Sequence, residues 1–169
     1  MEALVVKKNS FTQKLKRIKE IFIPPVKVTK VDDNVVILRN MRIPVRDGIA
    51  LSANIYKPKT PGQYPAILSL HPYNKDNLPK DHISIQYRMI RQTNKFTISE
   101  ETGWEAPDPD FWVKNNYIVI NIDKRGFGKS DGRQDFFNES ESTDYYDAIE
   151  WAASQSWCNG KVGLLGVSY

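Results

Sequence analysis

The residues with the clearest potential for covalent chemistry lie at the end of the sequence. An apolar run over residues 162–167 leads into Ser168, with Gly166 two positions before the serine and Tyr169 directly after it. A strand that breaks sharply after Gly-x-Ser holds the serine hydroxyl exposed at the edge of a sheet, in the strained turn called a nucleophile elbow. Ser168 is therefore a candidate nucleophile, and the corresponding chemistry is acyl transfer through an acyl-serine.

A serine nucleophile needs a base, and the chain contains two histidines, His71 and His82. In α/β-hydrolases the catalytic residues follow one another along the chain as serine, acid and then histidine. Both histidines precede Ser168, so on that scheme neither is the base. His71 directly follows an apolar run, and we expect it to form hydrogen bonds locally at the end of a strand.

A glycine-rich segment at 126–130 raises the alternative of phosphate binding. A phosphate-binding loop has the pattern Gly-x4-Gly-Lys-Ser, which requires glycine at position 123, but this position is Asp123. Gly-x-Gly-x-x-Gly also fails, because position 131 is Asp131. The segment therefore predicts a tight turn after a strand, with Arg125 available to pair with acidic neighbours. The sequence shows no Cys or His cluster with metal-ligand spacing, and we expect no metal and no cofactor.

The segments that would position Ser168 alternate between strands and a helix. Residues 34–57 predict a β-hairpin that turns at 46–48, where Asp-Gly is a strong turn signal. Short apolar strands are predicted at 65–70, 117–123 and 162–167, with a helix at about 143–154 and a turn at 159–160. A helical crossover between short apolar strands indicates an α/β fold in which the later strands are parallel and buried.

Residues 76–110 form a long polar segment with little periodicity, which in a compact domain is usually functional or contains short helices. The end of this segment, at 104–112, is rich in aromatic residues and prolines. Two interpretations stay open here. These residues form a wall of a substrate pocket, or they form a packed loop.

The N-terminal 33 residues predict a basic arm on a body formed by residues 34–169. Residues 1–30 contain eight Lys or Arg and two Glu, whereas the rest of the chain is mildly acidic. An acidic body argues against nucleic-acid binding. Residues 9–23 predict an amphipathic helix that ends at Pro24-Pro25. Such a helix either binds a membrane surface or a partner, or is an appended helix that docks on the domain or is partly frayed. We favour the second interpretation because the apolar stripe is short.

The bulk composition is that of an ordinary globular protein. The 169 residues are 40% hydrophobic and 26% charged, enough for one domain with a sizeable core. No apolar run approaches the roughly 20 residues of a membrane-spanning helix, and the N-terminus does not resemble a signal peptide. The single cysteine, Cys158, cannot form an internal disulfide. We therefore expect a cytoplasmic location.

Several motifs together resemble a known family. The chain is similar to the N-terminal part of the serine hydrolases grouped with cocaine esterase and X-Pro dipeptidyl-peptidase, over about residues 35–169. Four segments carry the resemblance: the hairpin at 44–51 (PVRDGIAL), the residues 71–75 (HPYNK), the segment 123–132 (DKRGFGKSDG), and 151–169 (WAASQSWCNGKVGLLGVSY). In this order they are far more specific than Gly-x-Ser alone.

The resemblance implies an α/β-hydrolase fold and a hydrolase of acyl esters or amides. It implies Ser168 as nucleophile, with the Tyr73 hydroxyl and the Tyr169 backbone N–H as oxyanion donors. It also implies that the triad acid and histidine follow residue 169. We therefore expect an N-terminal part of a longer enzyme, inactive by itself, which acts on a small-molecule or peptide acyl substrate. The alternative is a truncated, non-catalytic interaction module that uses its basic arm.

Overall fold

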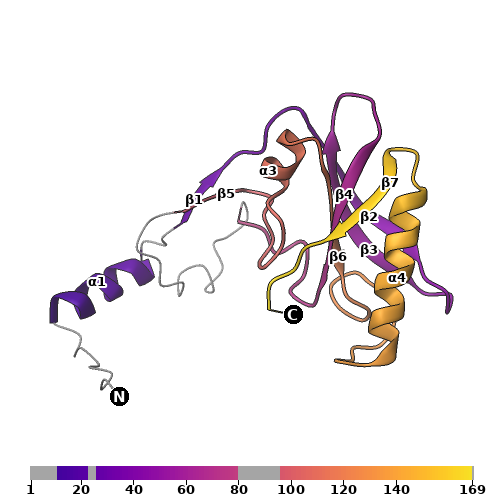
Figure 1. The fold of residues 1–169 in the computed structure, drawn as a ribbon. Coiled ribbons are helices and arrows are strands. Elements are labelled where there is room, and N and C mark those ends of the chain that lie inside the picture. Colours follow the sequence, from indigo (N-terminus) through magenta and orange to yellow (C-terminus); the bar gives the residue numbers. More distant parts are fainter. Residues whose placement is uncertain (1–10, 23–25, 80–95, 169) are drawn as a thin grey trace, which may run out of the picture.

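The central feature of the fold is a five-stranded sheet with the strand order β2-β3-β6-β4-β7 (Figure 1). The computed structural model describes residues 11–22, 26–79 and 96–168. A two-stranded sheet, β1-β5, lies apart from the main one. The strands are β1 (Val26–Thr29), β2 (Val35–Pro44), β3 (Ala50–Pro58), β4 (Tyr64–His71), β5 (Phe96–Ser99), β6 (Ile118–Asp123) and β7 (Cys158–Leu164), and the helices are α1 (Phe11–Phe22), α3 (Pro109–Lys114) and α4 (Glu139–Ser154).

The predicted β-hairpin is confirmed as β2 and β3, which pair in antiparallel register. Gly48 takes a positive φ of 88° in the connecting turn, a conformation that glycine adopts without strain. The side chains of β3 are mostly buried on both faces of the sheet because β3 pairs with β2 on one side and with β6 on the other. The hairpin thus forms one end of the sheet and leads the chain into its centre.

The three later strands are parallel to one another, as the helical crossover predicted. β4 pairs in parallel with β6 on one side and with β7 on the other. The crossover helix, α4, begins after its N-cap residue Asn138, whose side chain accepts a hydrogen bond from Glu141 N at 3.2 Å. Since parallel strands end at the same edge of a sheet, the segments that follow β4, β6 and β7 all emerge at one edge.

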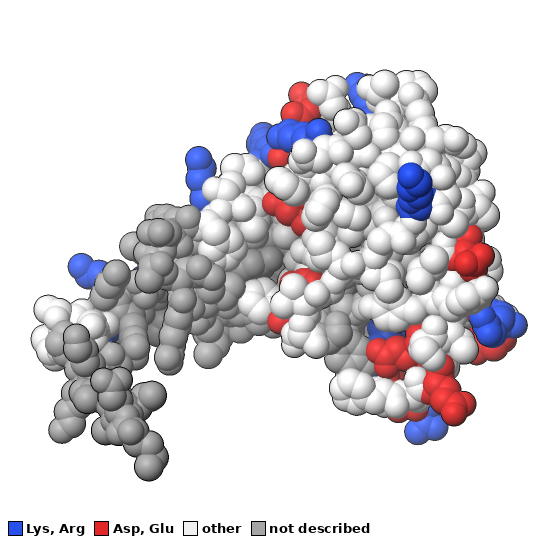
Figure 2. Space-filling model, in the orientation of Figure 1, with Lys and Arg blue, Asp and Glu red and all other residues white. Residues whose placement is uncertain are grey.

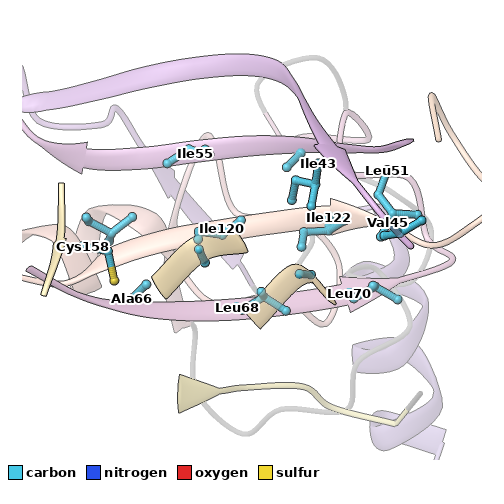
Figure 3. Close-up of a cluster of buried hydrophobic side chains, with 14 residues drawn as sticks. Ile43, Val45, Leu51, Ile55, Ala66, Leu68, Leu70, Ile120, Ile122 and Cys158 are labelled. Carbon is cyan, nitrogen blue, oxygen red and sulfur yellow. The ribbon is translucent and has the colours of Figure 1, made fainter. Parts of the chain in front are cut away.

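Alternate side chains of the strands pack on opposite faces of the sheet. Ile120 and Ile122 of β6 face α4 and join the main core, part of which is drawn in Figure 3. Val119, between them in sequence and pointing the other way, packs with Tyr56 and with Val113 of α3. The helix predicted at about 143–154 is present as α4, and its residues Ala148 and Ala152 belong to the main core. The sheet is therefore covered by α4 on one face and by α3 on the other.

The final strand differs from its prediction in two ways. β7 begins at Cys158, so the expected turn at 159–160 lies inside the strand as a local irregularity, with Gly160 at a φ of 82° and a register shift against β4. We also expected β7 to be buried, but most of its residues are exposed or half-buried. In the described structure β7 pairs with β4 alone and forms the edge of the sheet, so its outer side has no covering element there.

The long segment before β6 contains short elements that we did not predict individually. Phe96–Ser99 forms β5, which pairs in parallel with β1 some 70 residues earlier in the chain. Of the two interpretations of residues 104–112, the packing of two tryptophans favours the structural one. Trp104 packs against the small cluster of Val26 and Ile98. The Trp112 ring lies edge-on to the Tyr117 ring, with a centroid separation of 5.3 Å.

The predicted N-terminal helix is present as α1, but three of its apolar side chains are not docked. Phe11, Leu15 and Ile18 are exposed, which does not fit a docked helix, one of the two forms of the interpretation that we favoured. No helix among the described residues is long and apolar enough to cross a membrane. On the face drawn in Figure 2, the acidic and basic side chains of the described residues are intermixed. The division into an arm and a body stays a prediction.

Candidate active site

Three segments emerge at the edge of the sheet where the parallel strands end. They are residues 71–75 after β4, residues 123–132 after β6, and residues 165–168 after β7. Leu165 N donates to Leu68 O at 3.0 Å. This hydrogen bond holds the first residue of the segment after β7 against β4. Tyr73 and Ser168 therefore both lie in segments that follow neighbouring parallel strands at the same edge.

Ser168 has an unusual backbone conformation. Its φ is 72°, in the left-handed region that only a few per cent of residues other than glycine adopt, and its side chain is exposed. Asparagine accounts for three other positive φ values in the described structure, and its side chain favours this region. Serine has a weaker preference of this kind, so the conformation of Ser168 is a strained one imposed by the turn. Tyr169, the predicted backbone donor, lies outside the described residues.

Tyr73 is half-buried and is held by the residue at the end of β4. Its backbone N–H donates to His71 Nδ1 at 3.2 Å, and its ring stacks on the His71 ring with a centroid separation of 5.6 Å. Stacking and the backbone hydrogen bond together fix the path of the chain at Tyr73. This side chain is the predicted oxyanion donor, and its segment follows β4, the strand that pairs with β7.

Both ring nitrogens of His71 have hydrogen-bond partners. Because Nδ1 accepts from Tyr73 N, the proton is assigned to Nε2, which donates to Asn121 Oδ1 at 2.5 Å. Burial lowers the pKa of His71, although the bond to Asn121 opposes this effect. The local hydrogen bonding predicted for His71 is confirmed, and the ring is engaged in structure instead of facing a serine. His82 lies outside the described residues.

A fully buried charged side chain at this edge, Lys75, was not among the predicted site residues. Lys75 N donates to Asp123 Oδ1 at 2.7 Å, and Lys75 Nζ lies 3.3 Å from Asp123 Oδ2. Both side chains are fully buried. Lys75 Nζ also donates to Asn40 Oδ1 and Asp76 Oδ2, each at 3.0 Å. The carboxylate at the end of β6 thus ties the segment after β4 to the centre of the sheet.

The glycine-rich segment after β6 encloses this carboxylate and does not form a phosphate cradle. Lys129 N donates to Asp123 Oδ2 at 3.0 Å, and a Cβ atom on Gly128 would lie 2.2 Å from that same oxygen. Gly128 is therefore required for the close approach of the backbone to Asp123. Arg125 pairs with Asp144 and Asp47, as predicted for an arginine with acidic neighbours. No group of three metal-ligating side chains occurs in the described ranges.

This arrangement of parallel strands and of the segments that follow them coincides with a match to a described family. Residues 47–169 match the X-Pro dipeptidyl-peptidase (S15) family, which is well over half of the chain. The chain belongs to this family. The resemblance inferred from the four sequence segments is therefore confirmed, as is the fold expected from it, the N-terminal half of an α/β-hydrolase.

Individual relatives and solved structures are also similar to this chain. The chain is 30% identical over 141 residues to a cocaine esterase from a Rhodococcus species, covering 82% of this chain and 20% of the relative. A crystal structure of a CocE/NonD family hydrolase from Staphylococcus aureus superposes with a TM-score of 0.71 and 38% identity, covering 80% of this chain and 24% of that one. An α-amino acid ester hydrolase, 22% identical, shares the fold, with a TM-score of 0.58 over 99% of this chain and 25% of its own.

The chain spans about a fifth to a quarter of the length of these relatives. The family is one of hydrolases that includes esterases and peptidases.

Two residues of this edge that were not predicted, Lys75 and Asn121, had only weak signals in the sequence. Asn121 interrupts an otherwise apolar strand, and Lys75 follows the strand end by four positions, where a lysine ordinarily faces solvent.

Proposed function

We propose that this protein is a serine hydrolase that cleaves acyl esters or amides through an acyl-enzyme on Ser168. The observation that carries the proposal is the left-handed φ of 72° at Ser168, four residues after the end of β7, an edge strand of an α/β-hydrolase sheet. This geometry presents a serine hydroxyl at the end of the sheet. The hydroxyl would attack the acyl carbonyl, release the alcohol or amine, and form an ester that water then hydrolyses.

The negative charge that develops on the carbonyl oxygen needs fixed donors. We assign the Tyr73 hydroxyl and the Tyr169 backbone N–H to this role. The support for Tyr73 is its place in the segment that follows β4, the strand paired with β7. Donors of this kind are already oriented before the reaction and typically contribute a factor of about 10²–10³ in rate each.

The base and the acid of the triad are proposed to lie outside residues 1–169. His71 has both ring nitrogens engaged, and it precedes Ser168 in the chain. Without a base the serine hydroxyl is a weak nucleophile. Residues 1–169 alone are therefore expected to hydrolyse esters poorly. The substrate class follows the relatives, so both small esters and X-Pro peptides are candidates.

A second candidate is a non-catalytic interaction module that acts through its basic N-terminal arm. The observation that favours it is the exposure of Phe11, Leu15 and Ile18 on a lysine-containing helix. Ester hydrolysis separates the two candidates, because only the first requires Ser168. For both candidate functions we propose a cytoplasmic location, and we propose that nucleic acid is not a partner.

The proposal is tested with the product of the longest reading frame that begins at Met1 and contains these residues. The p-nitrophenyl ester of a short acid and an X-Pro p-nitroanilide are offered to it as substrates. Hydrolysis of either, lost at least about 10³-fold in Ser168→Ala, is the expected result. Ser142→Ala, on an exposed turn of α4, is the matched control and should retain activity. A product that hydrolyses neither substrate, or that is unaffected by Ser168→Ala, would contradict the proposal.

A further inference from the structure

The residue two positions after Tyr73 is a lysine with no exposed surface. Burying an ammonium group is costly unless charges and hydrogen bonds compensate for the lost water. Lys75 Nζ has three oxygen neighbours, on Asp123 at 3.3 Å and on Asn40 and Asp76 at 3.0 Å each. Lys75 Nζ thus donates two hydrogen bonds and forms an ion pair with Asp123, and together these hold the side chain in one position.

The carboxylate of Asp123 binds backbone as well as the ammonium group. It accepts Lys75 N at 2.7 Å from the segment after β4, and Lys129 N at 3.0 Å from the segment after β6. The same carboxylate therefore holds two of the three segments at this edge. Asp123 is itself held at the end of β6, where it lies opposite His71 of β4 in the parallel register.

Tyr73 is consequently fixed from both sides along the chain. On its N-terminal side His71 accepts the Tyr73 N–H and stacks on its ring, while His71 in turn bonds to Asn121. On its C-terminal side Lys75 is bound to Asp123 through both backbone and side chain. Asn74, between Tyr73 and Lys75, has a positive φ of 68°, so the chain turns sharply there and depends on its neighbours to hold that turn.

We propose that Lys75 and Asp123 are positioning residues, which hold the Tyr73 hydroxyl where the oxyanion forms during acyl transfer. This inference rests on the proposed function and extends it to residues that touch no substrate. An apolar pair of similar size would stabilise the fold as well or better, because the desolvation of two charges offsets most of their attraction. An ion pair adds directional bonds, and these fix the position of a loop in a way that apolar contacts do not.

A double-mutant cycle between Lys75 and Tyr73 tests the inference. The variants are Lys75→Met, Tyr73→Phe and their combination, in the product of the longest reading frame. Lys75→Met is expected to lower kcat by about tenfold to a hundredfold, since misplacing a catalytic group by about 1 Å has an effect of this size. KM should change less than about threefold, because the lost interaction matters in the transition state.

The combination distinguishes positioning from a structural role. If Lys75 acts through the Tyr73 hydroxyl, the double variant should have a kcat within about twofold of Tyr73→Phe alone. If Lys75→Met lowers kcat by the same factor in the protein with Tyr73 and in Tyr73→Phe, the inference is overturned. Lys114→Met, which removes an exposed lysine at the other end of the parallel strands, is the matched control and should leave kcat unchanged.

Two further results separate the possible failures. If Lys75→Met does not fold, as judged by loss of a cooperative melt, Asp76→Asn replaces it in the cycle, because Asp76 contacts Lys75 Nζ but is partly exposed. Additive losses for Asp76→Asn and Tyr73→Phe would then overturn the inference. If the unmodified product is inactive or does not depend on Ser168, the proposed function fails, and the inference fails with it for that different reason.

Discussion

At the scale of single residues, the site depends on glycines that allow the backbone to approach a buried carboxylate. Gly128→Ala would place a Cβ atom 2.2 Å from Asp123 Oδ2, at a residue whose φ is already positive. We expect it to lower the free energy of unfolding by roughly 2–4 kcal/mol, because backbone strain and a steric clash add together. Urea titration followed by tryptophan fluorescence measures the change.

Gly48→Ala is the control for this clash. Gly48 also has a positive φ, but a Cβ atom there would have no neighbour within 4 Å. Its expected cost is about 1–2 kcal/mol, from the backbone conformation alone. Equal losses for the two alanine variants would show that the carboxylate of Asp123 is not enclosed as the structure has it.

His71 makes a pH-dependent contribution to stability. Burial lowers its pKa below the usual value of 6.5, so the folded protein binds a proton there less readily than the unfolded chain. The free energy of unfolding should therefore fall as the pH decreases below about 6.5, and this effect should be absent above it. His71→Gln keeps a side-chain donor for Asn121 and should flatten the slope between pH 7 and 5. Identical slopes in thermal melts of the two proteins would contradict this expectation.

At the scale of elements, α4 is joined to the rest of the fold by two arginine–aspartate pairs of different burial. Asp144 is buried and pairs with Arg125 at 2.6 Å, whereas Asp147 pairs with the exposed Arg46 at 2.7 Å. Arg125→Met should cost about 3–5 kcal/mol, because it leaves a buried carboxylate unpaired. Arg46→Met should cost less than about 1 kcal/mol, since its charge is mostly in water.

Urea titrations of these two arginine variants give the comparison directly. The expected order is a large loss for Arg125→Met and a small one for Arg46→Met. Similar values for both would mean that the burial of Asp144 contributes little, and that α4 is held on the sheet by its apolar face alone.

The elements that could be predicted from the sequence are those whose signals are local. The hairpin has alternating residues around an Asp-Gly turn, and β4, β6 and α4 have their own periodicity. β1 and β5 have four residues each and exist through pairing across about 70 residues, which a local pattern does not contain. The exposure of β7 could not be predicted from a local sequence pattern either, because it depends on which strands lie next to β7 in the sheet.

The candidate site likewise contains residues that could be predicted from the sequence and residues that could not. Ser168 and Tyr73 were predicted because motifs name their types and places, although their catalytic roles stay proposals. Lys75 was missed because its burial is produced by Asp123, 48 residues further along the chain. A lysine in a polar loop gives no local sign of such a partner. The sequence thus predicts which residues could react more readily than which residues hold them.

At the scale of the whole molecule, the open edge at β7 sets how residues 1–169 behave when expressed alone. Leu164 and Val167 are 57% and 58% exposed, beside a strand paired on one side in the described structure. Exposed apolar edge strands promote association between chains. We expect concentration-dependent self-association in sedimentation velocity, reduced by Leu164→Lys.

Phe137→Lys is the matched control for self-association, because Phe137 is highly exposed but lies away from this edge. It should leave the sedimentation profile unchanged. A chain of residues 1–169 that stays monomeric at all concentrations and melts cooperatively would contradict the expectation, and would favour an independent interaction module.

The most direct test of the central proposal is covalent labelling of Ser168. The product of the longest reading frame is treated with a fluorophosphonate, and the modified peptide is located by mass spectrometry. An activated serine is phosphonylated by such reagents, whereas ordinary serines are not. The account predicts a single adduct on Ser168, absent from Ser168→Ala and from protein unfolded in urea. No adduct, or an adduct on another residue with Ser168 unmodified, would contradict the assignment of Ser168 as the nucleophile.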